Sequence, residues 1–291
     1  MTNLDPALRV LPQSVRQALT GLPRRQLDRL EEVRLRCGQP ATMVLAGREQ
    51  ALTGAGGPVT PEQLQALVSQ ASGHSAYAAE QQLSRGFLTL SGGHRLGVCG
   101  WAVLSGGQVK TLRELSSVNL RIARELPGLA DRLLDRQRAA RHSLLIVGPP
   151  GSGKTTLLRD TVRLLSDALG CRVSLADERG ELAAVWQGMP QLDVGRRTDV
   201  LTGCPKAVAA ELLLRAMNPE YLAMDEITAP EDVAAIEQAA HCGAYLLATA
   251  HASGVGELSR RPLYARLLAL GVFSQAAVLG PDKSYHLEVL P

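Results

Sequence analysis

The stretch Gly148-Pro149-Pro150-Gly151-Ser152-Gly153-Lys154-Thr155 decides the fold of this chain. Its glycines, lysine and hydroxyl have the spacing of a phosphate loop. Glycines let the backbone curl so that successive N–H groups point at a phosphate, and the helix that follows adds its positive N-terminal end. We expect Lys154 to reach the β- and γ-phosphates of a nucleoside triphosphate and Thr155 to bind Mg²⁺. The predicted binding residues are Gly148, Pro149, Pro150, Gly151, Ser152, Gly153, Lys154, Thr155 and Thr156.

The flanking residues have the context that a phosphate loop requires. Residues 143–147 read Ser-Leu-Leu-Ile-Val, which predicts a short buried strand, and residues 155–169 have helical spacing and end before Gly170. A glycine-rich turn without a ligand is the alternative, and this strand, loop and helix order argues against it.

Strands and helices alternate through the second half of the chain. Strands are predicted at 172–176, 221–224 and 245–249, with helices at 207–217 and 231–241. This order predicts a parallel sheet that binds its ligand at the carboxyl ends of the strands. We therefore predict an α/β fold in which residues 142–291 form a RecA-like phosphate-loop ATPase core, a parallel sheet flanked by helices.

The first half of the chain has a different pattern. Short apolar runs at 41–45 and 87–90 precede glycine-rich turns, and residues 61–71 have helical spacing. We predict a smaller α+β domain at residues 1–125, joined to the second domain by an arginine-rich helical linker at 126–141.

Composition limits the function classes. Aromatic residues are only 3% of the 291 residues, so few side chains are available to stack on nucleic-acid bases. The net charge of +3 does not by itself indicate a nucleic-acid partner.

The five cysteines are scattered and form no Cys-x-x-Cys pair, which is typical of a reducing compartment and argues against zinc. No apolar run approaches the roughly 20 residues of a membrane span. We expect a cytoplasmic protein without a transmembrane segment, whose membrane contact is made through partners.

An apolar strand at 221–224 ends in Asp225 and Glu226. We predict that Asp225 holds Mg²⁺ and that Glu226 orients and deprotonates the water that attacks the γ-phosphate. The alternative for such a pair is a helix N-cap. Combined with a phosphate loop, the pair favours ATP hydrolysis, and no Asn-Lys-x-Asp motif for guanine is present.

Two further segments carry candidate residues. His251 follows the strand after the Glu226 strand, where a sensor of the γ-phosphate is expected, although a lone histidine is more often a capping or solvent-facing residue. Residues 177–181 read Asp-Glu-Arg-Gly-Glu, and Glu178 is a candidate Mg²⁺ ligand. A charged loop with a helix cap is the competing interpretation of that segment.

Residues 104–108 spell Leu-Ser-Gly-Gly-Gln, the signature of transporter-type ATP-binding cassettes. That signature must follow the phosphate loop, whereas here it precedes it. We interpret it as a β-turn in which Gly106 and Gly107 take positive φ.

The motif order resembles that of the secretion and type IV pilus ATPases. The matching residues are the phosphate loop, the aspartate box at 177–181, Asp225-Glu226 and a histidine box at 249–252. Segments at 30–36, 93–100 and 117–125 extend the resemblance over nearly the whole chain to the stage III sporulation protein AA family of endospore-forming bacteria. One departure is Met224-Asp225-Glu226-Ile227, where secretion ATPases usually have Gly-Glu, and it makes transfer of their residue roles less direct.

The resemblance implies a ring-shaped homo-oligomer, a hexamer, that hydrolyses ATP with Mg²⁺. It also implies membrane-protein partners in a sporulation channel and a place on the mother-cell side of the engulfed forespore. In such rings, a neighbouring subunit supplies arginines to the γ-phosphate. Arg95, Arg113 and Arg121 are the candidates, with Arg196 and Arg197 as a second possibility and a solvated arginine as the alternative for each.

Two rival functions stay open from the sequence. One is a RecA-like ATPase that remodels nucleic acid through the arginines of residues 113–141. The other is an ATP-gated scaffold with little turnover. Lys154, Asp225 and Glu226 argue against the scaffold.

Overall fold

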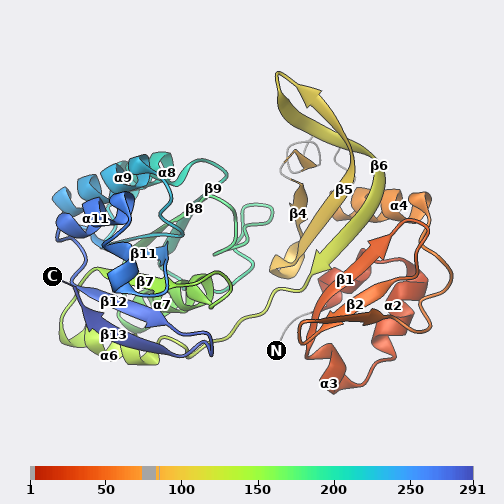
Figure 1. The fold of residues 1–291 in the computed structure, drawn as a ribbon, viewed down its shortest axis with the longest axis horizontal. Coiled ribbons are helices and arrows are strands. Elements are labelled where there is room, and N and C mark those ends of the chain that lie inside the picture. The colour runs from red at the N-terminus through yellow and green to blue at the C-terminus, as the bar shows by residue number, and fades with distance from the viewer. Residues whose placement is uncertain (1–3, 74–82, 85, 291) are drawn as a thin grey trace. The chain divides into compact units, whose positions relative to one another are not determined.

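A computed structural model describes residues 4–73, 83–84 and 86–290. The chain divides into two compact units (Figure 1). The N-terminal unit runs through Arg124 and includes the segment Trp186–Gln191, and the C-terminal unit contains the remaining residues from Glu125 onward. Each unit is described by itself below.

The N-terminal unit is built on a six-stranded antiparallel sheet in the order β3-β2-β1-β6-β5-β4. Its strands are β1 Leu30–Arg36, β2 Thr42–Leu45, β3 Arg48–Ala51, β4 Phe87–Thr89, β5 Arg95–Ser105 and β6 Gln108–Arg121. Its helices are α1 Asp5–Arg9, α2 Gln13–Thr20, α3 Arg24–Leu27 and α4 Pro61–Ala71, with a short 3₁₀ turn η1 at Ser91–Gly93.

The sequence signals in this unit correspond to local structure. Helix α4 has the predicted bounds because Thr60 and Gln63 form a reciprocal capping box at its start. Leu64, Leu67 and Val68 bury the apolar stripe of α4 in the core. The short apolar runs at 41–45 and 87–90 contain the strands β2 and β4.

The C-terminal unit holds a seven-stranded sheet in the order β13-β12-β7-β11-β10-β8-β9. All neighbouring strands are parallel except β13, which pairs antiparallel with β12. The strands are β7 Leu144–Gly148, β8 Val173–Asp177, β9 Thr198–Thr202, β10 Tyr221–Met224, β11 Tyr245–His251, β12 Gln275–Leu279 and β13 Tyr285–Val289. The helices are α6 Asp131–Ala139, α7 Lys154–Ala168, α8 Lys206–Met217, α9 Pro230–His241, α10 Val255–Leu258 and α11 Pro262–Ala269.

Two apolar cores lie on the two faces of this sheet. Along β7, Leu144 and Ile146 enter the core that includes α6 and α7, whereas Leu145 and Val147 enter the core that includes α8, α9 and α11. The central strands read as continuous apolar runs because both of their faces are covered by helices. The parallel sheet that the sequence predicted is confirmed.

The helical segment expected as a linker belongs to the C-terminal unit. Leu133 of α6 is buried in the core that contains α7. Gln137 of α6 is also buried and accepts a hydrogen bond of 2.8 Å from the hydroxyl of Tyr221, at the start of β10. Helix α6 is therefore anchored to the sheet.

Candidate functional site

The phosphate loop joins the end of β7 to the start of α7, and its backbone explains its glycines. Gly151 has a φ of 74° and Gly153 a φ of 100°, values that side chains other than glycine rarely adopt. At Gly148, an added Cβ would lie 3.1 Å from Cβ of Leu279 and 2.6 Å from Oγ of Ser152. Positive φ at Gly151 and Gly153 and the close approach at Gly148 therefore explain why the motif has glycine at these three positions.

Lys154 is buried at the first position of α7. Its Nζ donates a hydrogen bond of 2.9 Å to the carbonyl oxygen of Pro149, so the lysine closes the loop on itself. Burial lowers the pKa of Lys154, and the nearby carboxylates of Glu226 and Asp225 act in the opposite direction. The site therefore holds a poorly solvated ammonium group, which an anion would stabilise.

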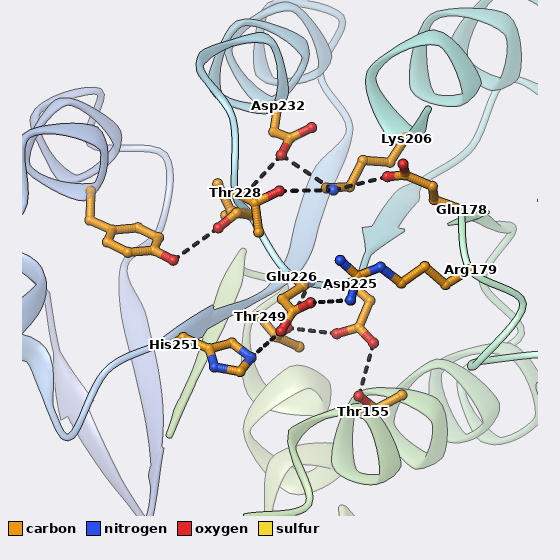
Figure 2. A network of polar contacts seen from close by, with 12 residues as sticks. Thr155, Glu178, Arg179, Lys206, Asp225, Glu226, Thr228, Asp232, Thr249 and His251 are labelled. Atoms are coloured by element: carbon orange, nitrogen blue, oxygen red, sulfur yellow. Dashed lines mark hydrogen bonds and ion pairs between the residues drawn. The ribbon is translucent and has the colours of Figure 1, made fainter. Parts of the chain in front are cut away.

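Asp225 connects three elements at the carboxyl edge of the sheet (Figure 2). Thr155 of α7 donates its hydroxyl to Oδ2 of Asp225 at 2.9 Å, and Thr249 of β11 donates to Oδ1 at 2.6 Å. The same Thr249 hydroxyl accepts a hydrogen bond of 2.8 Å from the backbone N–H of Glu226. Asp225 thus ties the start of the phosphate-loop helix to two strands.

Burial raises the pKa of Asp225, although the hydroxyls of Thr249 and Thr155 act to lower it. Both of these partners are neutral, so neither offsets the charge of the carboxylate. A divalent cation at this place would do so, and hydroxyl and carboxylate oxygens are ligands that Mg²⁺ accepts.

Glu226 has an unusual backbone conformation, and its carboxylate contacts one arginine and one histidine. Its φ is 49°, which is uncommon for a residue with a side chain and stores strain at this position. One carboxylate oxygen lies 2.9 Å from a guanidinium nitrogen of Arg179, and the other contacts Nε2 of His251 (Figure 2). The structure therefore places Glu226 and His251, two of the predicted site residues, in contact with each other.

The aspartate box is organised by Asp177. Its buried carboxylate accepts backbone hydrogen bonds from Glu181, Leu182 and Ala183 at 2.9 to 3.1 Å. Burial raises the pKa of Asp177 in spite of these three bonds. Arg159 of α7 donates to the carbonyl oxygens of Glu181 and Leu182, which fixes the same turn from the other side.

Glu178 is placed against Lys206, with an oxygen 3.0 Å from Nζ. Figure 2 shows this pair on the opposite side of Asp225 from Thr155. Its role as a Mg²⁺ ligand stays a prediction. Within the part of the chain that the structure describes, no group of three or more His, Cys, Asp or Glu residues is arranged to hold a metal ion.

Sequence reasoning missed the buried network around Lys206. Its Nζ lies 3.4 Å from Oδ2 of Asp232 and 3.5 Å from the hydroxyl of Thr228. The same Asp232 oxygen accepts the backbone N–H groups of Thr228 and Ala229, at the start of α9. One signal was available: Lys206 is one of four lysines in the chain, against 27 arginines.

A cavity of about 350 Å³ adjoins the phosphate loop and was also not foreseen. Ser152, Gly153 and Thr156 form its loop side. Its other walls include Leu129, Leu279 and Tyr285, and the guanidinium of Arg132 lies 5.8 Å from the Tyr285 ring centre. Its lining residues come from segments far apart in the sequence, so no local motif marks it.

The candidate arginines fall into two groups. Arg95, Arg113 and Arg121 belong to the N-terminal unit, where Arg95 and Arg121 are cross-strand neighbours on β5 and β6. Arg95 stacks on the Phe87 ring at 3.4 Å, and Arg121 lies 3.7 Å from Glu32.

Arg196 and Arg197 belong to the C-terminal unit. Nε of Arg196 lies 3.7 Å from Asp167, and Arg197 donates to the carbonyl oxygen of Gly170. Both arginines therefore contact the C-terminal end of α7 and the residues just after it.

Comparison with known proteins identifies the family. The model of the family described as sporulation stage III, protein AA, matches residues 2–286. The chain belongs to this family. The stage III sporulation protein AA of Bacillus subtilis (strain 168) is 39% identical over 89% of this chain and 85% of its own length. An uncharacterized protein, ycf45, of Porphyra purpurea is 29% identical over 61% of this chain and 33% of its own length.

Solved structures show which fold the family has. The ATPase DotB of Legionella pneumophila covers 92% of this chain and 80% of its own, with 18% identity and a TM-score of 0.58. The pilus retraction motor PilT, solved with bound ADP, covers 92% of this chain and 82% of its own, with 18% identity and a TM-score of 0.61. The predicted family and the RecA-like fold are therefore confirmed. Among the described residues, no helix has both the length and the apolar character needed to cross a bilayer.

The raised pKa of Asp225 gives a testable effect on stability. A folded-state pKa above the unfolded value contributes stability at pH below the ordinary carboxyl pKa, and this contribution is lost as pH rises through the folded pKa. Asp225→Asn removes the charge, so we expect the variant to melt roughly 2–4 °C above the wild type at pH 7 without nucleotide. The difference should shrink toward pH 4, as measured by calorimetry at several pH values.

Asp282→Asn is the control, because the exposed Asp282 accepts hydrogen bonds from Ser284 that lower its pKa. It should not stabilise the protein at pH 7. A melting temperature of Asp225→Asn at or below that of the wild type across this range would contradict the electrostatic interpretation.

Proposed function

We propose that this chain is a Mg²⁺-dependent ATPase, which converts ATP and water to ADP and phosphate. The observation that carries the proposal is the contact between Thr155 of the phosphate loop and Asp225, with Glu226 as the next residue. A hydroxyl and a carboxylate that meet at the start of a phosphate-loop helix are what a metal-bound triphosphate needs. The two structural relatives, one an ATPase and the other a motor solved with bound ADP, agree with this proposal.

In this proposal the phosphates lie on the loop backbone, and Lys154 exchanges its bond to Pro149 for the β- and γ-phosphates. The 350 Å³ cavity beside the loop takes the nucleoside, since its volume falls within the range of small-molecule pockets. Its apolar walls and Tyr285 suit a flat base, and Arg132 adds a planar cation near the same ring.

Thr155 and Asp225 are the residues that we propose to hold Mg²⁺, with water completing the shell. Glu178 stays the third proposed ligand, and its carboxylate lies 3.0 Å from Nζ of Lys206 in the structure. When bound, the metal neutralises charge on the β- and γ-phosphates.

Glu226 is the proposed general base. Its carboxylate is held by Arg179 and His251, and its backbone is held in a strained conformation by Thr249. An incoming γ-phosphate would compete with Glu226 for its contacts with Arg179 and His251, so the carboxylate would be released toward water as the site fills. In this proposal His251 senses the γ-phosphate through its contact with Glu226.

We propose further that the chain works as a ring-shaped homo-oligomer, a hexamer, which energises a membrane-embedded channel during endospore formation. Membership of the sporulation family supports the process. The protein would act in the cytoplasm on the mother-cell side of the engulfed forespore, bound to membrane proteins of that channel. Arg95, Arg113 and Arg121 are the proposed arginines that act on a neighbouring subunit's nucleotide.

Two variants separate binding from hydrolysis. Lys154→Ala should weaken MgATP binding by roughly 10- to 100-fold, because it removes a charge-assisted contact with the phosphates. Glu226→Gln should leave binding within about threefold and reduce hydrolysis by roughly 10²- to 10⁴-fold, because the amide cannot take the proton. Titration calorimetry and phosphate release measure the two effects.

Glu231→Gln, at an exposed position on α9, is the matched control. Wild-type turnover in both variants would contradict the proposal.

Ring-dependent turnover tests the arginine assignment. Arg121→Ala should leave ATP binding intact and reduce turnover of the assembled protein by roughly 10³-fold or more, since an arginine finger contributes about 10³ to 10⁵ in rate. Arg34→Ala is the control. Arg34 lies on β1, the strand next to the β6 strand of Arg121, and it pairs with the same Glu32. Unchanged turnover of Arg121→Ala, in particles of the same mass as the wild type, would exclude Arg121 from this role.

A further inference from the structure

A two-stranded arm extends from the sheet of the N-terminal unit (Figure 1). Strand β1 pairs with β6 only at Ser117–Arg121, and β4 pairs with β5 only at Arg95–Gly97. Residues 101–113, named the β5–β6 arm here, pair with no third strand among the described residues. Leu112 packs against the core of the unit at the base of the arm. A two-stranded ribbon by itself is marginally stable in water, so a surface that covers the outer part of the arm would stabilise it.

The arm exposes large apolar side chains. Trp101 is 70% exposed and Leu104 is 64% exposed, and Val109 lies directly across from Leu104. Soluble proteins rarely keep tryptophan and leucine this open at the end of a projecting element without a binding role.

The direction of the arm is built into the backbone. The register shifts between Cys99 and Trp101, opposite Glu114, which has a φ of 44°. Only glycine fits at position 100, since an added Cβ would lie 2.5 Å from the carbonyl oxygen of Arg113. A bulge of this kind bends a ribbon and aims its end.

The charged residues of the arm itself are all basic. Residues 101–113 contain Lys110 and Arg113 and no aspartate or glutamate, and Glu114 follows at the base of the arm. Along the arm, the Ser105–Gln108 pair lies nearest the turn, the Leu104–Val109 pair comes next, Lys110 follows, and the Trp101–Arg113 pair lies further back. Apolar residues at the end, with tryptophan and cations behind them, match the order of layers at a membrane surface.

We propose that the β5–β6 arm inserts its end into the headgroup region of an anionic lipid bilayer. Leu104 lies three residue steps beyond Trp101 along the strand, a length of about 10 Å, which is close to the depth of interfacial insertion, about 5–10 Å. Lys110 and Arg113 would then lie among anionic headgroups. This contact with lipid does not depend on ATP hydrolysis. It would attach the protein to the membrane directly, in addition to its proposed attachment through partner proteins.

Other occupants fit the arm less well. A second register shift, between Val103 and Leu104, interrupts the edge that an added strand would need. A second copy of the arm would bring the same cationic residues together, which opposes pairing.

Trp101 provides the readout, because the chain has only two tryptophans and Trp186→Phe leaves Trp101 alone. The full-length Trp186→Phe protein is mixed, without nucleotide, with vesicles of phosphatidylcholine containing phosphatidylglycerol. We expect a blue shift of Trp101 emission and co-sedimentation with these vesicles, and much less of both with phosphatidylcholine alone. High salt should weaken binding, since part of it is electrostatic.

Variants in the same background locate the contact. Leu104→Asp and the double variant Lys110→Gln, Arg113→Gln should each reduce vesicle binding by roughly tenfold or more. Val289→Asp is the matched control, since Val289 is exposed on β13 of the other unit, and it should bind as the parent does. Circular dichroism and melting temperature show that each variant is folded.

Three outcomes would overturn the proposal. The first is no Trp101 shift with anionic vesicles, and the second is equal binding by Leu104→Asp and its parent. The third is a shift that depends on protein concentration and not on lipid, which would assign the arm to a second copy of the chain.

Discussion

The carboxylate of Asp225 is the constraint on which the candidate site depends. It accepts hydroxyls from Thr155 on α7 and Thr249 on β11, while Thr249 also holds the backbone of Glu226. Removing charge from water at this place is unfavourable, as the raised pKa of Asp225 indicates. The buried charge of Asp225 therefore lowers the stability of the folded chain. In the proposed function, a bound metal and triphosphate would offset this loss of stability.

Around this point the site is divided between rigid and strained parts. The backbone of the aspartate box is fixed by Asp177 and Arg159, and the start of α9 is fixed by Asp232 with Lys206. Between these fixed turns lies Glu226, with positive φ and a carboxylate shared by Arg179 and His251. A strained residue between two anchored loops is suited to change its contacts when a ligand arrives.

The sequence predicted those parts of the site that local spacing determines. The phosphate loop and the acidic end of β10 could be predicted because glycine conformations and a strand's length are local properties. The Lys206 network and the cavity near Tyr285 could not, since they join segments far apart in the chain. Helix α6 shows the same limit, because its place in the C-terminal unit depends on the buried Leu133 and on the bond from Tyr221 to Gln137, residues that are 84 positions apart.

A structure determined with Mg²⁺ and a non-hydrolysable ATP analogue tests the central claim most directly. We expect Nζ of Lys154 to leave the carbonyl oxygen of Pro149 for the phosphates, the metal to lie at Thr155 and Asp225, and the base to occupy the cavity beside Tyr285. A nucleotide bound elsewhere, or a Lys154 that keeps its 2.9 Å bond to Pro149 while nucleotide is bound, would contradict it.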